Sequence, residues 1–423
     1  MYNFLKEQAN YLGRNAAEFT SELVRTPSPS LCEKNIAKII ERKMNELGYD
    51  KVVMDDFGNV FGIIYGIDSK PTVLLNSHMD TIMADESPEW QVSPYSGKIR
   101  DGRIYGLGTT DCKGGLAVQM YVGHLLKRAL LPMRGNLIVA ATVLEENGLS
   151  LGLQHLISKT LTDMKIKIDY AILGEPTGLG LYYGHDGWVE FEIGISAAAS
   201  GFLRGDSADA NFLQDTANVV LHDLVNVSQE NEFPGQPEMM SIKQPEFDHE
   251  NGNAFILFNR RLLANENADG LAKEFKESLS KISSRSLERN KKDLNFDVRI
   301  HEEARRLDNG ETVQVRYLRS AWETDPFSPL MDRARQALSS AGCKLQPGKW
   351  QLPRLGMGTA GSILTKKFKI PTIGYGPGTE EAAHSPNENV EISNITEAIL
   401  GTAAIVHSLA GIPVFGWTAD LEI

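Results

Sequence analysis

Cysteine is scarce in this sequence, with three in 423 residues. Cys32, Cys112 and Cys343 are widely spaced, odd in number and without a CxxC pattern, which argues against a disulfide framework and against a thiolate metal site. No window approaches about eighteen uninterrupted apolar residues, so we expect no transmembrane helix. The opening stretch MYNFLKEQANYLGRN also lacks the apolar core of a secretion signal. We therefore expect a cytoplasmic protein.

Positive charge is also in deficit, because 43 Lys and Arg stand against 55 Asp and Glu, giving a net charge of −12. This balance argues against nucleic acid and anionic membranes as partners. The hydrophobic content of 42% and charged content of 23% are typical of a globular protein. Since the chain is too long for one ordinary core, two domains are expected.

The first part of the sequence alternates helical and strand patterns. Apolar residues recur at helical spacing over 34–47, and a short β-rich run over 71–81 turns polar at its end. A second helix is expected after the glycines at 114 and 115, and a second strand over 136–146. This alternation predicts an α/β domain with a mainly parallel sheet and helices on both faces.

The pattern changes after about residue 186. Strands are expected over 188–196, 253–263 and 294–303, with helices over 215–229 and 271–293. Helix and strand of the first kind resume at 327–342 and 370–378. We therefore predict a catalytic domain of residues 1–185 and 304–423, interrupted by an inserted two-layer α+β domain of residues 186–303.

Histidines and carboxylates follow several of the predicted strands. In open α/β sheets, functional sites assemble at the carboxyl ends of the strands, so these side chains are expected to converge. The candidates are His78 and Asp80, Glu145 and Glu146, and Glu175 at three strand ends, Asp111 in a glycine-punctuated turn, and His384 in a loop.

Each pair is ambiguous when taken alone. His78 and Asp80 lie two apart, so on a strand both side chains point to the same side, but a turn could equally satisfy such a histidine. Glu145 and Glu146 would repel each other unless a cation offset their charge, or unless both were solvated at a loop start. A dication would leave the second carboxylate free for proton transfer.

Taken in order, the motifs resemble a known family. HMDT, GTTDCKGG, the Glu145–Glu146 pair, GEPT and AHSPNE follow the order of the zinc aminoacylase and carboxypeptidase family, the M20-type metallopeptidases. That family includes acetylornithine deacetylase, succinyl-diaminopimelate desuccinylase and carboxypeptidase G-like enzymes. RGDSADA, NRRL, KWQLPRLGMGTAG and GYGPGTEEAAHSPNE are most similar to its bacterial selenium-metabolism hydrolase branch.

The resemblance implies two divalent metal ions, zinc in the first place, with cobalt or manganese as substitutes. His78, Asp111 and Glu175 would hold one ion; Glu146, His384 and the shared Asp111 would hold the other. Glu145 would take the proton of a water shared by the two ions, and the resulting hydroxide would attack an amide carbonyl. Asp80 would orient His78.

The resemblance also implies the substrate site and the assembly. Arg261, or alternatively its neighbour Arg260, would bind the free carboxylate of a small-molecule substrate, and Thr359 is a further candidate. The inserted domain would act as a lid and mediate a homodimer. Cys112 and Lys113 are interpreted as structural parts of their turn.

The sequence departs from the family at the lid. Where relatives carry a histidine that stabilises the oxyanion, the matching residue is Ala198, with Phe202 and Ser207 also differing nearby. Ala360 replaces the usual Asn or Asp. Losing one oxyanion donor costs about 2.7–4 kcal/mol of transition-state stabilisation. His185 and His222 lie nearby in sequence, but structural roles are favoured for both.

Two functions follow from these observations. The leading one is a metallohydrolase of the peptidase and deacylase class, which cleaves linear C–N bonds other than typical endopeptide bonds. Its substrates would be N-acyl amino acids or dipeptides. The alternative is a catalytically impaired paralogue that keeps the metal site and serves as a binding or assembly protein. The complete ligand set and Glu145 favour the enzyme, whereas Ala198 favours the alternative.

Overall fold

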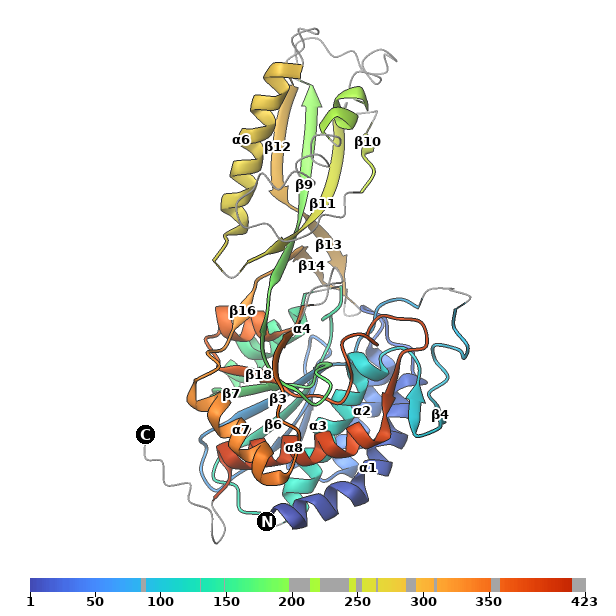
Figure 1. The fold of residues 1–423 in the computed structure, drawn as a ribbon, viewed down its shortest axis with the longest axis vertical. Helices are drawn as coiled ribbons and strands as arrows, with labels where there is room; N and C mark the ends of the chain where they lie inside the picture. Colours follow the sequence, from blue (N-terminus) through green and yellow to red (C-terminus); the bar gives the residue numbers. More distant parts are fainter. Residues whose placement is uncertain are drawn as a thin grey trace.

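The computed structural model describes most of the chain in two bodies, a broad α/β domain and a narrower domain that projects from one end of it (Figure 1). The described residues are 1–84, 89–129, 131–147, 149–197, 214–220, 243–248, 253–263, 265–286, 294–307, 310–350 and 358–412.

The larger body contains a nine-stranded sheet in the order β1-β2-β6-β3-β7-β18-β8-β16, with β17 paired to β8. Its centre, β6-β3-β7-β18, is parallel. The strands are β1 (Lys51–Met54), β2 (Val60–Ile64), β3 (Val73–His78), β6 (Leu137–Thr142), β7 (Tyr170–Leu173), β8 (Leu181–His185), β16 (Trp322–Glu323), β17 (Pro347–Trp350) and β18 (Thr372–Gly374).

Helices cover both faces of this sheet. Successive side chains of β3 alternate between two hydrophobic clusters, with Val73 and Leu75 in one and Leu74 in the other, because neighbouring residues of a strand point to opposite faces. The first cluster contains residues of α1 (Tyr2–Val24), α2 (Lys34–Glu46), α3 (Gly114–Arg128), α7 (Pro329–Ala341) and α8 (Ile392–Ala410). The second contains residues of α4 (Leu151–His155), η2 (Leu156–Leu161) and η3 (Ile363–Lys367). The α/β architecture predicted from the sequence is confirmed.

Helix α8 is long and apolar enough to cross a membrane by composition alone, but 67% of that window is buried inside the protein. It packs against α1, α3 and α7. These contacts are those of a core helix.

The projecting body is a five-stranded antiparallel sheet, in the order β10-β11-β9-β12 with β15 also paired to β9, and it carries α6 on one side (Figure 1). Its elements are β9 (Gly187–Ala197), β10 (Glu246–Asp248), β11 (Asn253–Leu262), α6 (Ala268–Ser286), β12 (Leu294–Ile300) and β15 (Leu318–Arg319). The hairpin of β13 (Glu302–Arg306) and β14 (Thr312–Arg316) lies between the two bodies (Figure 1). Strand β15 pairs with β9 although it lies after residue 303, where the sequence predicts that the inserted domain ends. That domain boundary remains a prediction.

Some predicted elements have different bounds. The strand expected over 136–146 ends at Thr142, because Leu144 takes a φ of 55°, which extended backbone does not allow. Of the helix expected over 215–229, the residues up to 220 are helical and the remainder lies outside the described residues. A three-stranded sheet of β4 (Lys98–Arg100), β5 (Arg103–Tyr105) and β19 (Asn389–Glu391) was not expected.

Candidate metal centre and its surroundings

Three neighbouring parallel strands deliver candidate ligands to one edge of the sheet. Strand β3 ends at His78, and it lies between β6, which leads to Glu146, and β7, which leads to Glu175. Because parallel strands present their carboxyl ends at the same edge, residues distant in sequence meet there.

Asp111 lies at the centre of the cluster. Its Oδ1 is 3.0 Å from His78 Nε2, while its Oδ2 is 3.2 Å from His384 Nε2. Glu175 Oε2 is 3.8 Å from the same nitrogen of His78, and Glu146 Oε1 is 2.9 Å from His384 Nε2. The five residues thus form two groups that could each hold a metal ion, and Asp111 belongs to both.

The electrostatics of the cluster suit cations. Burial raises the pKa of Glu175 well above its usual value, and the charges of Asp111 and Glu145 raise it further. Burial alone would raise the pKa of Asp111 too, but hydrogen bonds to His384 and His78 outweigh it and lower that pKa. For His384, burial is outweighed by the Glu146 and Asp111 carboxylates, which raise its pKa to about 11.

These shifts show that positive charge is strongly favoured between the carboxylates. A donor set of two imidazoles and three carboxylates suits zinc and similar divalent ions, and such an ion would displace the imidazole protons. The residues present therefore fit two divalent metal ions.

Asp80 forms contacts with both sides of the cluster. Its backbone carbonyl lies 2.9 Å from His78 Nδ1, whereas its carboxylate is 3.5 Å away. The carboxylate accepts hydrogen bonds from the backbone N–H groups of Glu145 and Glu146 at 3.0 Å, and from the Ser30 hydroxyl at 2.6 Å. Asp80 therefore fixes the turn that carries both glutamates as well as the imidazole.

Glu145 is bound by two residues that sequence reasoning missed. Its Oε1 accepts a hydrogen bond from Ser150 Oγ at 3.1 Å and forms an ion pair with Arg319. The contact of Arg319 has no sequence signal, because this residue lies 174 residues away and follows no motif.

A third missed residue, Glu388, holds the turn that carries Asp111. Its Oε1 accepts the N–H groups of Thr110 at 2.7 Å and Asp111 at 3.1 Å, and its Oε2 accepts that of Gly108 at 2.9 Å. Glu388 is the last residue of the AHSPNE motif, which also contains His384. The motif therefore supplies a candidate ligand of one group and a carboxylate that fixes the turn of Asp111, the candidate ligand common to both groups.

The turn residues Cys112 and Lys113 are both fully buried. Lys113 Nζ donates to the carbonyls of Leu23 and Thr26 at 3.0 Å, which ties the turn to the end of α1. Cys112 Sγ accepts the N–H of His78 at 3.1 Å, and the thiol lies within the first group of candidate ligands. Burial raises the pKa of this thiol to about 12.

The structure places the predicted substrate residues at the junction of the two bodies. Arg261 forms an ion pair with Asp186, and Arg260 forms one with Glu266 at 2.6 Å. Thr359 is 3% exposed, and its N–H donates to His185 Nε2 at 2.8 Å. Their roles in substrate binding remain predictions.

The remaining positions divide between buried and undescribed residues. Ala360 is buried beside Thr359, in the second hydrophobic cluster. Ala198, Phe202, Ser207 and His222 lie outside the described residues.

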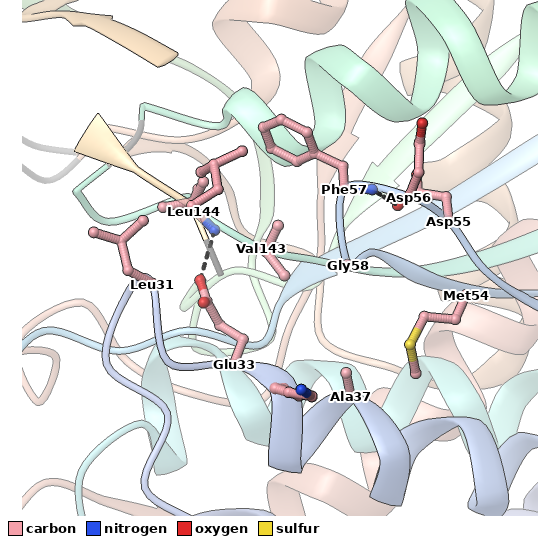
Figure 2. A pocket seen from close by; sticks show the side chains of 12 residues that line it. Leu31, Glu33, Ala37, Met54, Asp55, Asp56, Phe57, Gly58, Val143 and Leu144 are labelled. Carbon is pink, nitrogen blue, oxygen red and sulfur yellow. Dashed lines mark hydrogen bonds between the residues drawn. The ribbon is translucent and has the colours of Figure 1, made fainter. Parts of the chain in front are cut away.

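A cavity of about 230 Å³ is lined by Val143 and Leu144, which precede Glu145 in the chain, together with Glu33 and residues 54–58 (Figure 2). The side chain of Glu33 points toward Leu144, whose N–H donates to Glu33 Oε1 at 3.1 Å. Burial and the nearby charge of Asp80 raise the pKa of Glu33 to about 8. None of the candidate metal ligands lines this cavity, so it is separate from the metal centre.

Comparison with known proteins agrees with the fold. The sequence pattern of Peptidase family M20/M25/M40 matches residues 74–408, and the chain belongs to this family. It is a hydrolase that acts on amide or peptide bonds, and members of the family bind two metal ions.

Two relatives illustrate the range of similarity. The chain is 28% identical to the uncharacterized protein YgeY of Escherichia coli strain K12 over 417 residues, which cover 96% of each chain. It is 30% identical to the succinyl-diaminopimelate desuccinylase of Wigglesworthia glossinidia brevipalpis over 164 residues, 39% of this chain and 43% of that one.

Two solved structures share the fold. The dipeptidase Dug1p of Saccharomyces cerevisiae superimposes with a TM-score of 0.70 at 17% identity, covering 97% of this chain and 98% of the other. YXEP of Bacillus subtilis, a dinuclear metal-binding peptidase of the M20 family, superimposes with a TM-score of 0.64 at 14% identity, covering 94% and 98%.

Proposed function

We propose that the chain is a dinuclear metal-dependent hydrolase of linear amide bonds in N-acyl amino acids or dipeptides. The observation that carries this proposal is the carboxylate of Asp111, whose two oxygens lie 3.0 and 3.2 Å from the histidines of two different ligand groups. One ion would be held by His78, Asp111 and Glu175. The other would be held by Asp111, Glu146 and His384.

The ions would supply Lewis acidity, which lowers the pKa of a water and polarises the scissile carbonyl. Zinc is proposed, with cobalt or manganese as substitutes, since all the donors are nitrogen or oxygen.

The work of proton transfer is assigned to Glu145. The Oε1 of its carboxylate is held by Ser150 and Arg319, and among the described residues its Oε2 has no hydrogen-bond partner. That oxygen is proposed to take the proton of the attacking water and to return it to the leaving amine. Asp80 supports this step because it binds the N–H groups of Glu145 and Glu146.

The substrate is proposed to be a small molecule with a free carboxylate. Arg261, or its neighbour Arg260, is proposed to bind that carboxylate, with Thr359 at the same junction. The inserted domain is proposed to form a homodimer, and the cytoplasm is the proposed location. Within the family, the motifs that resemble the selenium-metabolism hydrolase branch support assignment to that branch.

A panel of N-acyl amino acids and dipeptides tests the proposal, with the protein loaded in turn with zinc, cobalt or manganese. We expect turnover of at least one class, abolished by a chelator and by Glu145→Gln. Retention of two ions without turnover across the panel would instead support the impaired paralogue, which Ala198 favours.

A further inference from the structure

Arg319 is a buried arginine whose side-chain hydrogen bonds in the described part of the chain all go to one residue. It is 3% exposed, its NH1 donates to Glu145 Oε1, and its NH2 donates to the Glu145 carbonyl at 3.1 Å. Its Nε has no partner among the described residues. A buried guanidinium without counter-charge would be costly, so this contact is a specific part of the fold.

The site of Arg319 is built to admit its side chain. Gly358 approaches it so closely that a Cβ at this glycine would lie 2.0 Å from Arg319 Cδ. Any larger residue at 358 would therefore displace the arginine stem. Arg319 itself belongs to β15, which pairs with β9 of the inserted domain, with Arg319 opposite Trp188.

The contact with Arg319 makes the two carboxylate oxygens of Glu145 different from each other. Ser150 and Arg319 both bind Oε1, which leaves Oε2 without a hydrogen-bond partner among the described residues. The planar guanidinium forks between Oε1 and the carbonyl of the same residue, so it fixes both the rotation of the carboxylate and the backbone beneath it.

We propose that Arg319 is a positioning residue for Glu145, which orients the carboxylate from β15, a strand that pairs with β9 of the inserted domain. This positioning role rests on the proposed function only because Glu145 is assigned there as the base. The pair itself can be tested without turnover. Because Arg319 is anchored to β9, the proposal also makes the position of the base dependent on the seating of the inserted domain.

A thermal double-mutant cycle on the metal-loaded protein tests the pair. It compares wild type, Arg319→Met, Glu145→Gln and the double variant. We expect each single change to lower Tm, because it leaves one buried charge unpaired. The decrease in Tm of the double variant should be smaller than the sum of the two single decreases by at least about 2 °C. Additive shifts would overturn the pairing, whether or not a substrate is known.

A crystal structure of metal-loaded Arg319→Met tests the positioning. We expect the Glu145 carboxylate to rotate while His78, Asp111 and His384 keep their positions. An unmoved carboxylate would overturn the proposal even if the pair contributes to stability.

Kinetics on the best substrate of the panel complete the test. We expect Arg319→Ala to lower kcat at least tenfold with KM within about twofold, because a misplaced base weakens the transition state more than the bound substrate. Arg319→Lys should retain part of the activity, and added guanidinium should partly rescue Arg319→Ala but not Glu145→Gln.

Arg316→Gln is the matched control, because this arginine in the adjacent hairpin pairs with Asp269 and Glu302 instead of Glu145. It should leave kcat unchanged. A rise in kcat on loss of Arg319 would contradict a positioning role and show that the arginine restrains the base. Absence of turnover in wild type would refute the proposed function, while the thermal cycle and the crystal structure would still decide the role of Arg319.

Discussion

At the scale of single residues, Asp111 is the side chain on which both proposed ions depend. A carboxamide has one oxygen acceptor instead of two, so Asp111→Asn cannot serve both groups of ligands. We expect wild type to bind two ions per chain and Asp111→Asn to bind at most one, measured by elemental analysis after dialysis. Asp56→Asn is the control, because Asp56 pairs with His155 and Lys159 on the surface. Two ions retained in Asp111→Asn would exclude the bridging role.

Substitution of Glu145 and of Glu146 by glutamine should have different effects on turnover and on metal content. Glu145→Gln keeps the shape of the side chain but cannot accept a proton, so we expect turnover to fall by a factor of about 10² to 10⁴ with metal content near wild type. Glu146→Gln should instead lose metal, because Glu146 faces His384 at 2.9 Å. Kinetics and metal analysis of the two variants, prepared side by side, check this. Equal metal loss in both would mean that the roles are exchanged.

The structure brings together the five residues that the sequence singled out, because each of them follows a strand or lies in a motif with a fixed order. His78 is the last residue of β3, and the turn with Asp111 leads directly into α3. The contacts of Arg319 and Glu388 with the site were missed, although Glu388 ends the AHSPNE motif. Their contacts, to Glu145 and to the 108–111 turn, join segments 174 and about 280 residues apart, which no local periodicity encodes.

At the scale of elements, His185 ends β8 and holds the junction between the two bodies. Its Nδ1 lies 2.7 Å from the carbonyl of Asp186, and its Nε2 accepts the N–H of Thr359 at 2.8 Å. The ring also packs edge-on against Trp322 and Trp350. Both hydrogen bonds are made by the neutral imidazole, with the proton on Nδ1.

Burial lowers the pKa of His185 from 6.5 to about 4. Between these values the unfolded chain binds more protons at this position than the folded protein does, so stability is complete above pH 6.5 and falls as the pH drops toward 4. The loss is at most about 1.4 kcal/mol per pH unit. We expect urea unfolding at pH 7 and pH 5 to show this fall in wild type and a smaller one in His185→Gln. Equal pH dependence in both proteins would show that His185 does not contribute.

The ends of β11 and β6 show which strand boundaries the hydrophobic pattern of the sequence predicts and which it does not. The alternation of β11 between buried and half-buried side chains is visible in the sequence, and its strand was predicted at nearly the observed position. The end of β6 was predicted too late, because the backbone of Leu144 is left-handed, and its N–H donates to Glu33 instead of to a neighbouring strand. A leucine at such a position carries no turn signal.

At the scale of the whole molecule, the proposed metal ligands all lie outside the inserted domain. The points at which the chain leaves the larger body and returns to it are adjacent, since His185 pairs with Trp322 across β8 and β16. Replacing residues 187–319 with a short glycine-serine linker should therefore close a hairpin between these strands. We expect the shortened protein to fold and to bind two ions, and to lack turnover because Arg261 and Arg319 are removed.

The same variant tests the proposed assembly. In light scattering at micromolar concentration, we expect the full chain to run as a dimer and the shortened chain as a monomer, because the exposed edges of the inserted sheet would be absent. A monomeric full chain, or a shortened chain that still dimerises, would contradict dimer formation through this domain.

Because the chain leaves the larger body and returns to it at adjacent points, the inserted domain also affects how the central sheet folds. The parallel pairing of β7 with β18 joins Ala171 to Thr372, residues on either side of the inserted domain. The entropy lost in closing a loop grows with its length, by about 0.6 kcal/mol for each doubling. An inserted domain that forms first brings Trp188 and Arg319 side by side, so the remaining search spans a much shorter effective loop. In that case the insertion would assist formation of the central sheet, and slow pairing of β9 with β15 would delay the whole domain.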